Sequence, residues 1–388
     1  MLKLAFTNLA AKKARTLLAL LGLMIAILGV IGLISISGGI ETLFHETLTK
    51  VEGITVLNKA MPSPVMSRIP EKDGDTIERE VPGVEVAIPT IMFPAFQIED
   101  KNTYLEGRIF DMYAVIGTDA AKRRRLKDGG VFNRHLLRGR ALEDRTDGRA
   151  EVMISKDAAA FFGRDVGQKL RVWKGLEPFE LEIVGIFHTG SIILDRQLIV
   201  PLRFARELAG VREGIVCSFY VETKPGANPA QVGRDIEARL AHLDARTPEE
   251  VESEFAFIFR DLDIFLAAIG AIAILVGAVG VVNTMLMSVT ERVTEFGVLR
   301  ATGWTRGDVL RLVVCESAAI GVIGGLAGCG AGAAIVRAVG LFLPVRPVAT
   351  PSLLVASFFV AIALGVLGGL YPAWRASRLD PIHAIRHI

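Results

Sequence analysis

Four long runs without a charged residue constrain this 388-residue chain more than any other feature. They cover residues 17–39, 264–289, 317–336 and 351–371, and none contains an internal Lys, Arg, Asp or Glu. Each has the length that an α-helix needs to cross about 30 Å of hydrocarbon. A hydrophobic content of 51% is also above that of most soluble domains. The sequence therefore predicts an α-helical membrane protein with four transmembrane helices.

The N-terminal segment, residues 1–16, places Leu2, Phe6 and Leu9 among Lys3 and Lys12. This pattern predicts an amphipathic helix that lies on the cytoplasmic membrane surface. A cleaved signal peptide is the alternative interpretation of the first apolar run. That run is longer than the usual signal core of about 7–15 residues, so we expect an uncleaved anchor.

The distribution of Lys and Arg predicts the orientation, because basic residues near helix ends favour the cytoplasmic side. They gather before the first run, in the loop 290–316 and in the tail 372–388, whereas the loop 337–350 has two. Both termini are therefore expected in the cytoplasm of a bacterial cell, with the chain as a multi-pass inner-membrane protein. Residues 40–263 and the short loop 337–350 then lie outside the cytoplasm.

The segment 40–263 is long enough to form its own hydrophobic core. Strands are predicted at 53–57, 151–154, 179–187 and 215–222, and a helix at 229–243 with Asn228 as its cap. We expect a large mixed α/β domain. The basic stretch Lys122–Arg125 is interpreted as a solvated loop or helix that divides this domain into two lobes, with a ligand site as the alternative.

Motifs of catalytic and metal chemistry are absent from the sequence. HExxH, GxSxG, CxxC and the phosphate-binding GxxxxGK[ST] do not occur. A net charge of +2 without an aromatic-interleaved basic patch argues against nucleic acid as a partner. The histidines have no close ligand partners in the sequence and are interpreted as ordinary surface residues: His45, His135, His188, His242, His383 and His387. We expect no enzyme activity and no catalytic, cofactor-binding or metal-binding residue, so any ATP and Mg²⁺ would be bound by another chain.

The cytoplasmic loop carries the most informative segment, residues 288–304, which reads SVTERVTEFGVLRATGW. Its spacing predicts a helix over 289–301 that Gly303 terminates. Glu291 and Glu295 share one face of this helix. The apolar side is expected to comprise Val289, Val293, Phe296 and Leu299. Simple anchoring of a helix end at the membrane surface is the alternative interpretation.

The string ER..E.G.LRA.G in this segment, Glu316 downstream and the tail YPAWRASRLDP at 371–381 resemble the MacB/FtsX-type ABC permease family, also called type VII or mechanotransmission permeases. The resemblance extends into the segment 40–263. There the pairs and single residues typical of MacB-like and LolC-like periplasmic domains occur in the same order: Gly139-Arg140, Glu151-Val152, Gly167, Val184-Gly185 and Val200-Pro201.

The resemblance implies a permease subunit of an ABC transporter that works with two copies of a cytoplasmic ATPase and with a second permease copy or paralogue. In some members a periplasmic adaptor joins the complex. The residues that match the coupling motif would dock a helix end in an ATPase groove, with Phe296 and Leu299 as apolar contacts. They are Glu291, Arg292, Glu295, Phe296, Gly297, Leu299, Arg300 and Gly303.

The implied output is export or extraction of a hydrophobic or amphiphilic substrate such as a drug, peptide, lipid or lipoprotein. The alternative is an FtsX-like regulator that passes the ATPase state to an outer partner without transport. No residue identifies the cargo. The segments 61–66 and 91–96 are weak candidates for a cargo surface, with an ordinary loop and a buried strand as their alternatives.

Glycine spacing in the third run predicts close helix packing, because small residues let two backbones approach in lipid. These glycines are Gly321, Gly324, Gly325, Gly328 and Gly332. Those of the second run (Gly270, Gly277, Gly280) and of the fourth run (Gly365, Gly368, Gly369) are the expected packing partners. We also expect a transmembrane dimer in contact with membrane lipid.

Overall fold

The computed structural model describes residues 13–95, 97–103, 112–143, 150–174, 177–342 and 347–378. The interfacial helix expected at 1–16 therefore lies almost wholly outside the described residues, as do Phe96, His383, His387 and the tail beyond 378. The chain forms two compact units. One comprises residues 1–41 and 257–388, and the other comprises residues 42–256, which we call the inserted domain.

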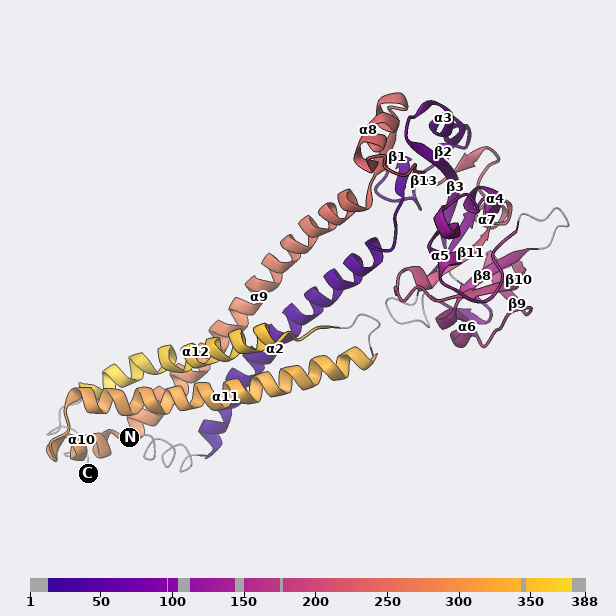
Figure 1. The fold of residues 1–388 in the computed structure, drawn as a ribbon. Helices are drawn as coiled ribbons and strands as arrows, with labels where there is room; N and C mark the ends of the chain where they lie inside the picture. Colours follow the sequence, from indigo (N-terminus) through magenta and orange to yellow (C-terminus); the bar gives the residue numbers. More distant parts are fainter. Residues whose placement is uncertain are drawn as a thin grey trace. The chain divides into compact units, whose positions relative to one another are not determined.

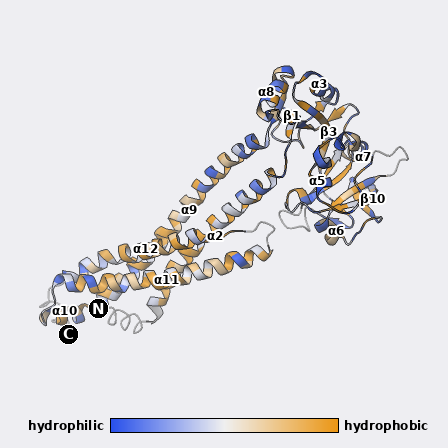
Figure 2. Ribbon diagram, viewed as in Figure 1, coloured by the Kyte–Doolittle hydropathy of each residue, from blue (hydrophilic) through white to orange (hydrophobic). Residues whose placement is uncertain are grey.

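Four long helices carry the apolar runs: α2 (Lys13–Leu48), α9 (Pro248–Glu291), α11 (Arg306–Phe342) and α12 (Pro351–Ser377) (Figure 1). All four are long and apolar enough to cross a membrane. Their middle parts form hydrophobic bands, whereas the start of α9 is hydrophilic (Figure 2). The helices extend past the predicted runs, since α9 has 44 residues and α11 continues to Phe342. The expected loop 337–350 is correspondingly shorter.

The glycines of α11 pack against other helices of the same chain. A Cβ on Gly321 would lie 2.8 Å from the carbonyl oxygen of Ala361 in α12. Gly325 also contacts α12. On the neighbouring face of α11, three glycines contact α2: Gly324, Gly328 and Gly332. The expected partner glycines of α9 are not the main contacts, since Gly277 meets Ala26 of α2 and Gly280 meets nothing. These contacts are intramolecular, so the glycines give no support to a dimer interface.

The inserted domain is built on one large sheet. Its strand order is β14-β1-β13-β3-β6-β11-β8-β10-β9-β4-β5, with β7 paired to β10. The pairs β6–β11 and β8–β10 are parallel, and the other pairs are antiparallel. The strands are β1 (Ile54–Asn58), β3 (Val84–Ala95), β4 (Gln97–Ile98), β5 (Lys101–Asn102), β6 (Tyr113–Thr118), β7 (Leu136–Gly139), β8 (Glu151–Ser155), β9 (Lys169–Lys174), β10 (Glu177–Phe187), β11 (Gln197–Pro201), β13 (Ser218–Thr223) and β14 (Leu243–Arg246). A second sheet pairs β2 (Ile69–Pro70) with β12 (Ile215–Val216).

Short helices cover this sheet. They are α3 (Lys72–Glu80), α4 (Ala120–Arg123), α5 (Gly130–Arg134), α6 (Lys156–Phe162), α7 (Leu202–Ala209) and α8 (Pro229–Arg239), with 3₁₀ turns η1 (Lys127–Gly129) and η2 (Leu194–Arg196). Asn228 caps α8 as predicted, since its side chain accepts hydrogen bonds from the backbone N–H groups of Ala230 and Gln231. The helix ends before Leu243, which belongs to β14.

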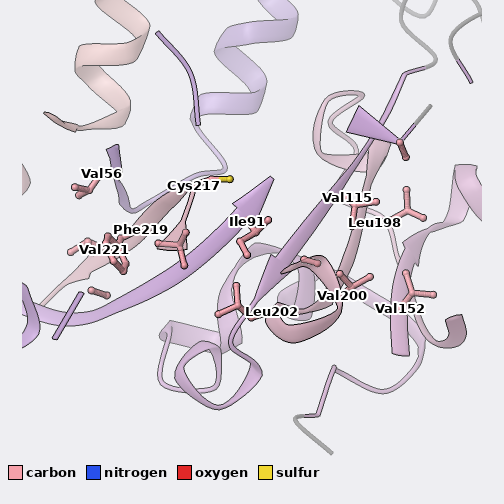
Figure 3. Close-up of a cluster of buried hydrophobic side chains, with 14 of the residues drawn as sticks. Val56, Ile91, Val115, Val152, Leu198, Val200, Leu202, Cys217, Phe219 and Val221 are labelled. Carbon is pink, nitrogen blue, oxygen red and sulfur yellow. The ribbon is translucent and has the colours of Figure 1, made fainter. Parts of the chain in front are cut away.

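One hydrophobic core runs along the sheet. It joins Val56 and Phe219 at one end to Val115, Leu198 and Val152 toward the other (Figure 3). The predicted division into two lobes is therefore wrong, because the sheet and its core continue past the basic stretch. The stretch does not separate two halves, since Leu126 beside it packs onto the same sheet through Val86 and Ile88.

The family pattern in this domain has a structural basis at the junction of β7, β8 and β10. Arg140 donates two hydrogen bonds to the carboxylate of Glu151, at 3.0 and 2.6 Å, and Glu151 is only 2% exposed. Gly139 has φ +79°, and a Cβ there would lie 2.2 Å from the carbonyl oxygen of Val184. Close strand contact thus explains the glycine, and a buried ion pair explains the arginine and glutamate.

Candidate functional site

The coupling segment begins at a break between two helices. α9 ends at Glu291, and α10 covers Val293–Ala301. Arg292 lies between them with φ −109° and ψ 18°, so the continuous helix expected over 289–301 is wrong at this residue. The break turns the Arg292 side chain into the interior.

Arg292 forms the electrostatic centre of the segment. Its Nη1 donates to both carboxylate oxygens of Glu316 in α11, at 2.9 and 3.0 Å, and its Nε donates to Glu295 at 2.7 Å. Arg292 is 8% exposed and Glu316 is 2% exposed. Burial alone would lower the pKa of Arg292, but its hydrogen bonds to Glu295 and Glu316 outweigh burial and raise the pKa. The guanidinium therefore stays charged and joins the α9–α10 break to α11.

Phe296 and Gly297 also face the interior. Phe296 is fully buried and packs in a cluster with Val289, Val309 and Leu312. The expectation that Phe296 contacts an ATPase is therefore corrected, because the apolar side of α10 lies against α11 and leaves that ring no free surface. Arg292, expected as a docking charge, is likewise internal.

A groove of about 450 Å³ runs along α10 and is partly lined by α11. It is lined by Arg292, Thr294, Glu295, Val298, Leu299, Trp304 and Leu312. Val298 is 49% exposed, and the Glu295 side chain is 64% exposed. Val298 and Trp304 were not predicted from the sequence as groove residues. Val298 could have been identified, because it is an apolar residue on the polar side of the predicted helix. The groove combines apolar surface with the exposed, ion-paired carboxylate of Glu295.

The end of α10 is fixed at both its backbone and its side chains. Gly303 has φ +108°, and Trp304 N–H donates to the carbonyl oxygen of Leu299 at 3.1 Å, which confirms the predicted stop at Gly303. Arg300 Nη1 donates to the carbonyl oxygen of Ser377 in α12 at 3.2 Å. α10 is thus connected to α9 through the chain, to α11 through Arg292, and to α12 through Arg300.

Three histidines have acidic partners that are distant in the sequence. His45 Nδ1 lies 2.7 Å from Glu252, His188 Nδ1 lies 3.1 Å from Asp195, and His242 Nε2 lies 2.8 Å from Asp73. All three are surface residues as expected, with side chains 61%, 42% and 47% exposed, but each has an acidic partner that the sequence spacing did not reveal. Folding brings the partners together across up to 207 positions.

His188, Asp157 and Asp195 place potential ligand atoms within 4.8 Å of one another. The Asp195 carboxylate already accepts hydrogen bonds from Thr189 N–H and Oγ1 at 2.8 Å and from Gly190 N–H at 3.0 Å. These bonds give Asp195 a structural role in the turn that follows β10.

Family models match both parts of the chain. The model described as a MacB-like periplasmic core domain matches residues 16–239. The chain belongs to the MacB/FtsX family of ABC transporter permeases. The second model, the FtsX-like permease C-terminal domain, matches residues 267–381 of this MacB/FtsX permease and includes α10.

Relatives match along nearly the whole permease. An uncharacterized ABC transporter permease of Methanocaldococcus jannaschii is 28% identical over 98% of this chain and 96% of its own length. The ABC transporter permease YknZ of Bacillus subtilis is 26% identical over 100% of this chain and 98% of its own. The macrolide export ATP-binding/permease protein MacB of Bdellovibrio bacteriovorus is 26% identical over 98% of this chain, which spans 61% of that longer relative.

Proposed function

We propose that this chain is the permease subunit of an ABC exporter and that the groove on α10 receives a separate cytoplasmic ATPase. The observation that carries the proposal is the arrangement of α10, which borders an open, mainly apolar groove and is connected to α9, α11 and α12. A short rigid helix held in this way can pass a displacement at its surface to several helices at once.

The charge distribution supports a cytoplasmic position for α10 and both termini, by the preference of Lys and Arg for that side. The inserted domain would then lie on the opposite side of the membrane. Two ATPase copies, which bind ATP and Mg²⁺, would act on two permease copies or on this chain and a paralogue. The Arg292–Glu316 ion pair would keep α10 and α11 moving together.

The transported substrate is proposed as a hydrophobic or amphiphilic molecule. Relatives are named for macrolide export and pyoverdine export, which supports export as the output. Transport measured in reconstituted vesicles separates this proposal from regulation without transport. ATP-driven substrate movement supports an exporter, and ATPase coupling without such movement would favour the regulator.

Replacement of Val298 by Asp tests the coupling groove. Val298→Asp puts a charge into exposed apolar surface beside Glu295 without touching the buried core, so it should weaken ATPase docking and leave the fold intact. Leu137→Asp is the matched control, because Leu137 is also exposed, at 55%, but lies in β7 of the inserted domain. Co-purification of the ATPase and the ATPase rate in nanodiscs are measured for both variants.

The two variants should differ sharply. We expect Val298→Asp to lose most of the co-purified ATPase while it retains the wild-type melting temperature, and Leu137→Asp to behave as wild type. Full ATPase retention and wild-type hydrolysis in Val298→Asp would show that the docking surface lies elsewhere.

A further inference from the structure

The inserted domain contains a small pocket between its sheet and the α4–α5 segment. The pocket has a volume of about 170 Å³. Its walls are mainly apolar and include Ile88, Met92, Ile116 and Phe132. A cavity of about 150 Å³ lined by apolar side chains is large enough to bind benzene. The space therefore suits a ligand with an apolar body of about six to ten non-hydrogen atoms.

Arg123 places a positive charge in this apolar pocket. Its Nε is buried and has no hydrogen-bond partner, and among the described residues no carboxylate forms an ion pair with it. The guanidinium carbon lies 4.9 Å from the ring centre of Phe132, a cation–π contact that compensates burial only in part. Burial lowers the pKa of Arg123 to about 10, so the side chain remains charged at neutral pH.

The neighbouring basic residues Lys122 and Arg125, unlike Arg123, pair with a carboxylate. Lys122 Nζ lies 2.8 Å from Glu78 Oε1, and Arg125 Nη1 lies 3.3 Å from Glu78 Oε2. Both oxygens of this nearby carboxylate are therefore already engaged. Within the Lys122–Arg125 stretch, Lys122 and Arg125 therefore form ion pairs with Glu78, whereas Arg123 lines the pocket.

A second unpartnered polar group lines the same pocket. Thr118, the last residue of β6, is 1% exposed, and its Oγ1 has no hydrogen-bond partner. Buried polar groups are nearly always hydrogen-bonded, and an unsatisfied one destabilises the fold. The unpartnered Nε of Arg123 and the unpartnered, buried hydroxyl of Thr118 lie on one small cavity, which suits a ligand that supplies hydrogen-bond acceptors.

We propose that this pocket binds a small organic monocarboxylate, with its carboxylate on Arg123 and its apolar body against Ile88, Met92 and Ile116. One guanidinium neutralises one carboxylate and can donate two parallel hydrogen bonds to it. The Thr118 hydroxyl lies on the same pocket and can donate a further bond to an acceptor there. The site lies wholly within the inserted domain, and the inference does not depend on ATPase coupling.

Binding of phenylacetate to the full-length chain in detergent tests the proposal, with saturation-transfer NMR and calorimetry as readouts. Phenylethyl alcohol and phenylethylamine keep the apolar body but replace the anion, and inorganic phosphate supplies an anion without the body. We expect phenylacetate to bind more tightly than all three. Phosphate binding more tightly than phenylacetate would overturn the carboxylate assignment, and no phenylacetate binding by wild type would overturn the site.

Substitutions assign the binding to the pocket. Arg123→Met should weaken phenylacetate binding about tenfold to a hundredfold, since a hydrogen-bonded charge pair is lost. Arg124→Met is the matched control, because Arg124 is the exposed neighbour, and it should leave affinity unchanged. Thr118→Val should also weaken binding while it raises the melting temperature of the ligand-free protein, and it carries the test if Arg123→Met fails to fold. Unchanged affinity in Arg123→Met, or in Thr118→Val, would refute the proposed contacts.

Discussion

At the residue scale, two arginines with charged sequence neighbours prove to be turned away from solvent, Arg292 fully and Arg123 in part. Arg292 and Arg123 both lie among charged neighbours in the sequence, which favours a solvated surface as the simplest interpretation. Arg292 turns inward because Glu316, 24 positions away, meets it in the fold. Burial of a charge depends on such distant partners, so local spacing could not predict which side chains of the segment are exposed.

Removal of the Glu316 carboxylate should destabilise the helical unit. Glu316→Gln leaves Arg292 buried without its main partner, which typically costs about 3–5 kcal/mol. Glu295→Gln is the control, because the Glu295 side chain is 64% exposed and such a pair contributes about 1 kcal/mol or less. Thermal unfolding in detergent should show a clear drop for Glu316→Gln alone. Equal melting temperatures in the two variants would contradict the structural role of Arg292.

Glu99 should make the inserted domain sensitive to acid. Burial alone would raise the pKa of Glu99, but hydrogen bonds from Arg164 and Arg171 outweigh it and hold the pKa below 4.5. This carboxylate therefore stabilises the fold above about pH 4.5, and the stabilisation is lost as the pH falls through the lowered pKa.

The measurement is thermal unfolding from neutral pH to about pH 3.5. Glu99→Gln should be less stable at neutral pH and should show a flatter loss of stability on acidification. Glu177→Gln, a change at an exposed residue of β10, should keep the wild-type slope. A wild-type slope in Glu99→Gln would contradict this assignment.

At the element scale, the four long apolar helices were predictable because an uncharged run of this length has few other structures. The ends of these helices were not predictable. For example, α9 begins at Pro248, in a charged segment that precedes the apolar run. Strands such as β8 were predictable from apolar runs, but the strand order was not, because β6 pairs with β11 across a long stretch of sequence. The predicted two lobes failed for the same reason.

Glycine substitution tests the contact between α11 and α12. Gly321→Ala puts a Cβ 2.8 Å from the carbonyl oxygen of Ala361 and 3.1 Å from Ile362 Cα, so the two backbones must move apart. Overpacking of this kind costs about 1–3 kcal/mol. Gly330→Ala is the control in the same helix, because a Cβ there meets nothing within 4 Å. Thermal unfolding should show a loss for Gly321→Ala only, and equal stability would refute close packing at this site.

At the scale of the whole molecule, the chain combines a four-helix unit with one inserted domain. Two permease relatives match this sequence over nearly their full length. The family and the order of the parts followed from hydropathy and the coupling motif. The proposed docking face could not be predicted from the sequence, because the sequence does not show which side of α10 packs on α11. The structure shows that Val298 is exposed and that Phe296 is buried.

Photo-crosslinking from α10 tests the central claim most directly. A photoreactive amino acid replaces Val298 in one variant and Leu137 in the other, and each is illuminated in membranes that also contain the partner ATPase. We predict an ATPase crosslink from position 298 that changes in yield when ATP is added, and no ATPase crosslink from position 137. Absence of the crosslink at 298 in a complex that hydrolyses ATP would contradict the account.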